Sequence, residues 1–132
     1  MMKLEYFANG CQDCPLILIY GAEETGALSL SQALSQIATG AANFVDVQVM
    51  ANFDTVNGCN LRIQNSKHEA NGVQMTEENS FIWALTADEC EDKIGLLEPF
   101  SKRTDDDTAK HRHQFMELNG EIKVIFSTDR QW

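Results

Sequence analysis

The 132-residue sequence is short of basic residues and of long apolar runs. It holds 10 Lys and Arg against 20 Asp and Glu, and no Lys or Arg lies between Leu4 and Leu61. Phosphate backbones and anionic lipid surfaces are bound through Lys and Arg, so a net charge of −10 argues against nucleic-acid and membrane partners. The longest apolar run, Pro15 to Tyr20, is too short to span a bilayer, and we expect no signal peptide and a cytoplasmic location.

Motifs of common enzyme classes are also missing. No Gly-x-Ser-x-Gly nucleophile motif occurs. The segment 21–26 follows a predicted strand as a phosphate loop would, but Glu23 and Glu24 stand where a phosphate would bind. The sequence therefore indicates no catalytic residue, and we expect a protein that is not an enzyme.

Four Asn-Gly dipeptides punctuate the chain, at 9–10, 57–58, 71–72 and 119–120. Asn-Gly tolerates positive φ at both central positions of the type I′ turn that joins paired strands, so it is a strong hairpin signal. Apolar alternation on either side of these dipeptides predicts strands at 3–8, 15–20, 44–56, 59–65, 73–76, 81–85, 112–118 and 121–128.

Two helices are expected between these strands. Ser29-Leu-Ser-Gln32 is a capping box before an apolar stripe that Gly40 would end, and the segment 23–26 is an alternative, earlier start. Thr86-Ala-Asp-Glu89 is a second capping box, and Pro99 should stop that helix near Leu97. The order ββ-α-βββ(β)-α-ββ predicts a single α+β domain spanning residues 1–132. It would have two layers, a mostly antiparallel sheet with both helices on one face.

Four cysteines without a leader sequence are typical of reduced cytosolic thiols. Cys11-Gln-Asp-Cys14 has the spacing of a redox or zinc-binding pair. A redox pair usually begins a helix, whereas Pro15 and a strand follow here. A zinc site would need a second pair, and Cys59 and Cys90 are 31 residues apart. We therefore expect no metal and no cofactor.

Two histidines, His111 and His113, would share one face of a predicted strand, because strand side chains alternate. Glu117 would lie on that same face, and the acidic run 105–107 is close in sequence. A divalent metal could be held by such a set. A small metal-binding domain or enzyme using His111, His113 and nearby carboxylates is therefore an alternative function.

Acidic residues are concentrated between Asp88 and Asp107. Eight of them face only Lys93, Lys102 and Arg103, so this stretch has a net charge of −5. An acidic surface attracts a basic protein or a metal cation and speeds their association, although it can also simply keep a protein in solution.

Small acidic immunity proteins, which neutralise bacterial nuclease toxins in the cytosol, share this kind of composition. By this analogy of class, with no family motif matched, we predict a non-catalytic protein that captures and neutralises a basic protein partner. The predicted contacts are the acidic start of the second helix, an acidic loop and a terminal aromatic side chain. They are Asp88, Glu89, Glu91, Asp92, Asp105, Asp106, Asp107 and Trp132.

Two points stay open. Trp132 can instead fray or fold back on the sheet. The chain can also be a structural subunit without catalysis, since the edge strands of a hairpin-built sheet are natural seams for a homodimer.

Overall fold

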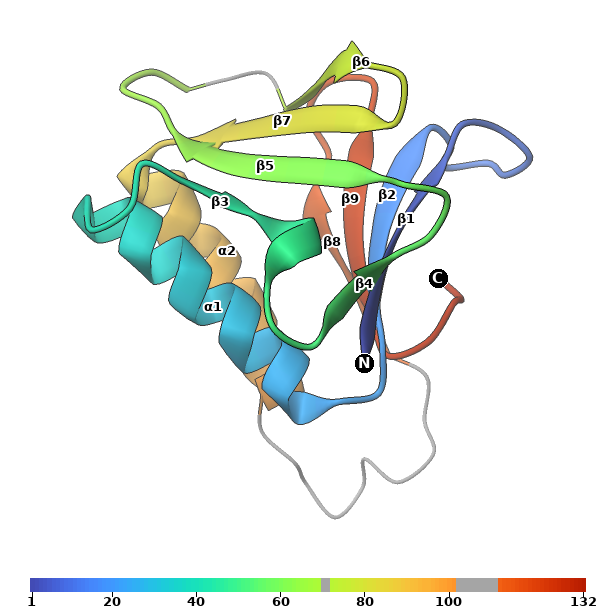
Figure 1. The fold of residues 1–132 in the computed structure, drawn as a ribbon, viewed down its shortest axis with the longest axis horizontal. Coiled ribbons are helices and arrows are strands. Elements are labelled where there is room, and N and C mark those ends of the chain that lie inside the picture. Colours follow the sequence, from blue (N-terminus) through green and yellow to red (C-terminus); the bar gives the residue numbers. More distant parts are fainter. Residues whose placement is uncertain (70–71, 102–111) are drawn as a thin grey trace.

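The computed structural model describes residues 1–69, 72–101 and 112–132 (Figure 1). Within them, nine strands form two sheets, and two α-helices pack side by side against the sheets. The α+β class and the predicted order of the elements are confirmed. The elements are β1 (Met2–Phe7), β2 (Leu16–Tyr20), α1 (Glu24–Thr39), β3 (Phe44–Asp46), the 3₁₀ helix η1 (Val47–Val49), β4 (Phe53–Thr55), β5 (Asn60–Asn65), β6 (Val73–Glu77), β7 (Ser80–Leu85), α2 (Ala87–Ser101), β8 (His113–Glu117) and β9 (Lys123–Ser127).

The strands divide between two sheets, where the sequence predicts one. A five-stranded sheet has the order β4-β1-β2-β9-β8, and a four-stranded sheet has the order β3-β5-β7-β6. Both are mixed, because β1–β4, β2–β9 and β5–β7 are parallel pairs while the other pairs are antiparallel. Parallel strands need a long connection, so no hairpin signal in the sequence reveals them.

The stretch 44–56, predicted as one strand, changes sheet halfway. Its first part, β3, pairs with β5, and its last part, β4, pairs with β1. Between them η1 buries Val47, and the Gln48 side chain accepts a hydrogen bond from the Leu61 N–H (3.0 Å). Asn52 then adopts a positive φ of 69°. The alternating valines predict one continuous strand, so the sequence does not show that this stretch is divided between two sheets.

The helix α1 begins at Glu24, at the alternative start, and not at the Ser29 capping box. Its first turn rests on Met2, whose side chain lies so close to Gly26 that a methyl group at that position would collide with it. This tertiary packing extends the helix beyond its local signal. Gly40 ends the helix with a φ of 80°, as predicted.

The helix α2 runs further than predicted. Its expected end near Leu97 is wrong, because it continues through Pro99 to Ser101. Phe100 is buried in the last turn, with its ring 5.0 Å from the ring of Phe126 in β9. Burial of this aromatic side chain stabilises a turn that proline alone would disfavour.

Two of the four Asn-Gly dipeptides close hairpins, Asn9-Gly10 between β1 and β2 and Asn119-Gly120 between β8 and β9. Asn57-Gly58 has positive φ at both residues (56° and 71°), but it leads from β4 in one sheet to β5 in the other. Asn71 lies outside the described residues. A third hairpin, β6–β7, turns at Asn79 with a φ of 58° and carries no glycine signal.

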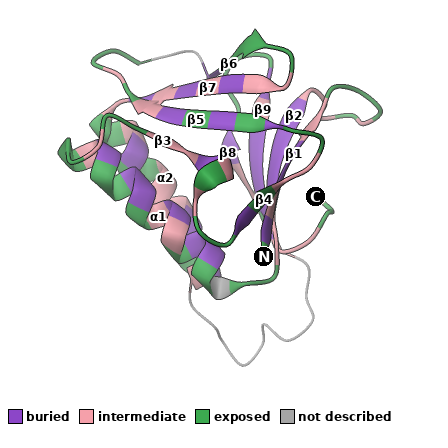
Figure 2. Ribbon diagram, viewed as in Figure 1, coloured by how far each residue is buried: buried purple, intermediate pink, exposed green. Residues whose placement is uncertain are grey.

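The main core lies where the two sheets and the helix pair meet (Figure 2). Trp83 of β7 is fully buried there, and its Nε1–H donates to Oε1 of Glu117 in β8 (3.0 Å). The other carboxylate oxygen of Glu117 accepts the N–H of Asn119 (3.3 Å), and the residue is only 4% exposed. This hydrogen bond ties the four-stranded sheet to the five-stranded one.

The Trp83–Glu117 hydrogen bond gives the first prediction. Glu117→Ala leaves a buried indole N–H without an acceptor, so the free energy of unfolding should fall by about 2 to 3 kcal/mol. Glu117→Gln keeps one carbonyl oxygen for that N–H and should lose clearly less. Urea unfolding measures both variants, and a loss below about 0.5 kcal/mol for Glu117→Ala would contradict the assigned role.

Candidate functional site

The acidic start of α2 is partly structural. The Thr86 hydroxyl accepts the N–H of Glu89 (3.1 Å), and the Thr86 N–H donates to the Glu89 carboxylate (3.0 Å), which completes the predicted capping box. The Glu89 carboxylate is therefore engaged in capping the first turn of α2. Asp88, Glu91 and Asp92 are exposed on the first two turns and carry no ion pair within the described residues.

Other predicted site residues fall elsewhere. Asp105, Asp106, Asp107 and His111 lie outside the described residues. His113 is exposed on β8, and its ring stands edge-on to the ring of Phe115 at a centroid distance of 5.9 Å. Glu117 points into the core, not to the face of His113 as expected, because a bulge between Phe115 and Glu117 shifts the register of β8 against β9.

Basic side chains of the two sheets and of the C-terminal segment are held in ion pairs. Four of them each bind one carboxylate, at distances between 2.8 and 3.4 Å. The pairs are Lys3–Asp54, Arg62–Asp46, Lys123–Asp13 and Arg130–Glu5. The last pair joins residues 125 positions apart, so the sequence gives no sign of it. These contacts neutralise four of the ten basic side chains.

A different set of carboxylates has no ion pair within the described part of the chain, and all of its members are exposed. They are Glu69, Glu77, Glu78, Asp88, Glu91, Asp92 and Glu121. They come from the loop after β5, the β6–β7 turn, the start of α2 and the β8–β9 turn, and Figure 1 shows the β6–β7 turn and the start of α2 at opposite ends of β7. The isolated bridge between Val73 and Ile122 brings the β8–β9 turn beside β6.

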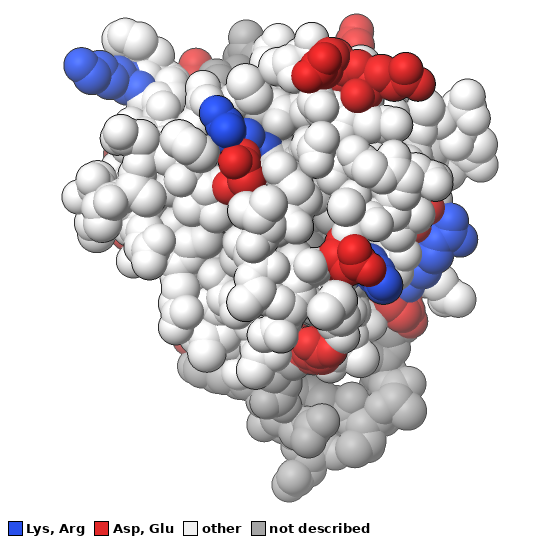
Figure 3. Space-filling view, viewed as in Figure 1, with Lys and Arg blue, Asp and Glu red and all other residues white. Residues whose placement is uncertain are grey.

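We call these seven residues the acidic end. Figure 3 shows acidic side chains gathered over the β6–β7 hairpin with no basic side chain among them. Lys67 and Lys93 lie on the same segments, which leaves five negative charges in excess. The density of acids in the sequence predicted only the three members on α2. The other four are single or paired acids in loops and turns, where no run of acids marks them.

A shallow, open depression separates two of these segments. Its volume is about 590 Å³, and it lies between the loop after β5 and the first turn of α2. Charged groups of both signs line it, namely Lys67, Glu69 and Asp88, together with His68. This mixed, open lining offers no enclosed site for a small molecule.

The outer face of the five-stranded sheet is covered by the C-terminal segment. Leu16, Leu18 and Ile125 are fully buried beneath it, and Trp132 packs against the same cluster. The Trp132 ring lies 5.2 Å from the ring of Phe7 in β1. The predicted terminal anchor is thus folded back on the sheet and only partly exposed.

A charged latch holds this segment in place. Arg130 donates two hydrogen bonds to the Glu5 carboxylate (3.0 and 2.9 Å), and the Tyr20 hydroxyl donates a third (2.9 Å). The hydrogen bonds from Arg130 lower the pKa of Glu5, although its burial opposes this. Burial raises the pKa of Tyr20, and its bond to Glu5 adds to the rise.

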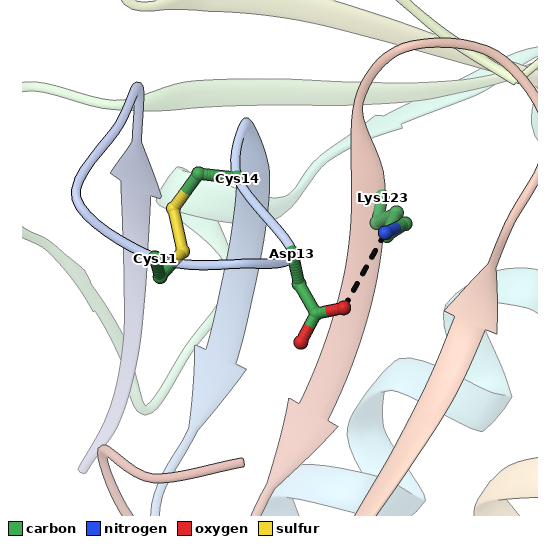
Figure 4. Close-up of a disulfide and its surroundings, with 4 residues drawn as sticks. All are labelled: Cys11, Asp13, Cys14 and Lys123. Atoms are coloured by element: carbon green, nitrogen blue, oxygen red, sulfur yellow. Dashed lines mark hydrogen bonds and ion pairs between the residues drawn. A yellow bond between two sulfur atoms is a disulfide. The ribbon is translucent and has the colours of Figure 1, made fainter.

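The four cysteines divide into two kinds. Cys11 and Cys14 form a disulfide in the β1–β2 loop, beside the ion pair of Asp13 with Lys123 (Figure 4). The expectation of four reduced thiols is wrong for this pair. Cys59 and Cys90 are free and buried, and burial raises the pKa of Cys59 to about 12 and that of Cys90 to about 11. Both buried thiols are therefore poor nucleophiles.

In residues 1–69, 72–101 and 112–132, no three His, Cys, Asp or Glu side chains stand close enough to hold a metal ion. In the same residues, neither helix has the length and apolar character needed to cross a membrane. Comparison with known proteins found no matching family model, no matching curated protein and no matching solved structure.

The division of the cysteines predicts a labelling pattern. Iodoacetamide at about pH 8 should label no cysteine of the native oxidised protein, because two are bonded and two are buried thiols of raised pKa. Unfolding without reductant should expose Cys59 and Cys90 alone, and added reductant should expose all four. Mass spectrometry counts the labels, and rapid native labelling of Cys59 or Cys90 would contradict the assignment.

The latch predicts a pH dependence. A carboxyl whose pKa is lower in the folded than in the unfolded state adds stability above its unfolded pKa and loses it as pH falls through the folded pKa. Part of the wild-type free energy of unfolding should therefore disappear below pH 4.5, the ordinary pKa of Glu5. Arg130→Ala should remove that part, and Gln131→Ala, a neighbouring exposed site, should keep it. Equal pH profiles for the wild type and Arg130→Ala, measured by urea unfolding, would rule the latch out.

Proposed function

We propose that this chain is a non-catalytic binding protein whose acidic end captures and neutralises a basic protein partner. The protein would act like a bacterial immunity protein that inhibits a nuclease toxin in the cytoplasm. One observation carries the proposal: seven exposed carboxylates in the loops and turns around β7 and at the start of α2 have no ion pair within the described residues, while four basic side chains of the sheets and of the C-terminal segment are paired with other acids.

Electrostatics gives such an end a clear role. Charges closer together than the Debye length of about 8 Å at physiological salt act on an approaching protein as one field. A nuclease active site is cationic because it binds phosphates, so an acidic surface would steer toward it and compete with nucleic acid. The inhibitor needs no chemistry of its own for this role.

The proposed contacts differ from the sequence prediction. Asp88, Glu91 and Asp92 stay in the contact set, since they are exposed and unpaired within the described residues. Glu89 is left out because it caps α2, and Trp132 is left out because it packs on Phe7. Asp105, Asp106 and Asp107 lie outside the described residues, and the proposal does not depend on them.

The disulfide is not part of this proposal. Cytoplasmic thiols keep most cysteine pairs reduced, so Cys11 and Cys14 would be free thiols in that compartment. Both cysteines are in the β1–β2 loop, which contributes no residue to the acidic end.

A capture experiment tests the proposed function. The immobilised chain is exposed to a bacterial lysate at low salt, bound proteins are identified, and each is purified and assayed for nuclease activity with and without the chain. We expect a basic nuclease that loses its activity at a one-to-one ratio. Its association rate should fall at least about tenfold between about 50 and about 500 mM salt.

Three neutralising substitutions locate the contact. The variant Asp88→Asn, Glu91→Gln, Asp92→Asn removes three negative charges from the acidic end and should slow association at least about tenfold. The control adds three positive charges at exposed positions outside that end, as Ala8→Lys, Gln12→Lys, Ala22→Lys, so both variants have the same net charge. Equal slowing in both would show that only net charge matters, which contradicts a localised contact.

A further inference from the structure

One face of this acidic protein carries few charged side chains. Between Glu24 and Asp54 the only charged residue is Asp46. This stretch forms nearly all of α1, together with β3, η1 and the start of β4. These elements lie on the side of the molecule turned to the viewer in Figure 1, and Figure 3 shows that side as a broad uncoloured area with charges only at its margins. We call it the neutral face.

The charges at its margins are paired. Asp46 binds Arg62 through two hydrogen bonds (2.8 and 3.1 Å). Asp54 binds Lys3 at 3.0 Å, and Glu23 binds the N-terminal amine. The neutral face is thus bordered by neutralised carboxylates, unlike the acidic end.

Large apolar side chains are exposed on this face. Val49 in η1 is 76% exposed, Leu28 in α1 is 49% exposed and Phe44 in β3 is 47% exposed. The Arg62 guanidinium lies 3.9 Å from the centre of the Phe44 ring and leaves the rest of the ring in solvent. Large apolar side chains exposed on one face are typical of a contact with another protein.

The outward side of α1 has the pattern of a helix contact. Five of its exposed residues recur at alternating spacings of three and four, which keeps them in one row along the helix, opposite the buried row. They are Thr25, Leu28, Gln32, Ser35 and Thr39, and Gln36 is exposed beside this row. A helix face that only meets solvent is usually rich in Lys and Glu, and this row has neither.

We propose that the neutral face binds a second copy of this chain. Two molecules of charge −10 repel each other at every surface that carries unpaired carboxylates. The neutral face is where two copies can approach with the least repulsion. A two-fold contact sets the same patch against itself, so an uncharged patch is self-complementary, whereas it offers nothing to attract a basic protein. The acidic ends of both copies would stay free, so this inference does not rest on the proposed function.

The contact should be weak, because the face offers only three large apolar side chains that are exposed. We expect a dimer dissociation constant on the order of 10 to 100 µM at about 0.15 M salt. Added salt should tighten it, since salt screens the repulsion between the two negative molecules and no ion pair holds them together.

Sedimentation equilibrium of the full chain tests this inference. Leu28→Glu and Val49→Glu each place a like charge twice in a two-fold contact, so each should weaken the dimer at least about tenfold. Met75→Glu is the control, because Met75 on β6 is 49% exposed, as Leu28 is, and lies outside the neutral face. All three sites are solvent-exposed, and circular dichroism checks that the variants fold.

Each outcome of the sedimentation experiment either supports or overturns the dimer. Dimerisation that strengthens with salt and is lost with Leu28→Glu and Val49→Glu, but not with Met75→Glu, supports the second copy. A wild-type chain that stays monomeric at about 1 mM and high salt overturns it. A dimer that salt weakens, or that Met75→Glu disrupts equally, also overturns it, since the contact would then lie elsewhere.

Discussion

Ten basic side chains cannot neutralise twenty carboxylates, and the positions of those few cations decide what the surface of this protein can bind. Four of them form ion pairs with carboxylates on β1, β3 and β4 or in the β1–β2 loop. Pairing there neutralises these four cations, and seven exposed carboxylates in turns, in a loop and at the start of α2 have no ion pair within the described residues. The few cations and their pairing thus divide the described surface into an acidic end and a neutral face.

Burial on both sides of β2 is what requires the C-terminal segment. Ile17 and Ile19 face the main core, while Leu16 and Leu18 face outward and would be exposed without a cover. The last residues supply that cover, and the Arg130–Glu5 contact holds them against the sheet. The aromatic side chain that sequence reasoning assigned to a partner is therefore used within the chain. This leaves charge, not aromatic anchoring, as the basis of the proposed recognition.

Local signals predicted the parts of the fold that depend on local chemistry. The Thr86–Glu89 capping box, the positive φ of Gly40 and the β8–β9 hairpin all follow from a few adjacent residues. The features that the sequence did not predict depend on contacts between residues far apart in the chain. The parallel pairing of β2 with β9 joins segments about a hundred residues apart, and the start of α1 depends on Met2 packing beneath Gly26. Alternating valines could not show that one predicted strand serves two sheets.

The same limit applies to the candidate site. The acids of α2 were found because they are dense in sequence, whereas Glu69, Glu77, Glu78 and Glu121 join them only in the folded chain. Near-surface potentials, measured residue by residue by nuclear magnetic resonance with a cationic and an anionic nitroxide, test this charge division most directly and need no partner. The account predicts strongly negative potentials at the acidic end and values near zero along α1 and η1. Potentials of similar size over both surfaces would contradict it.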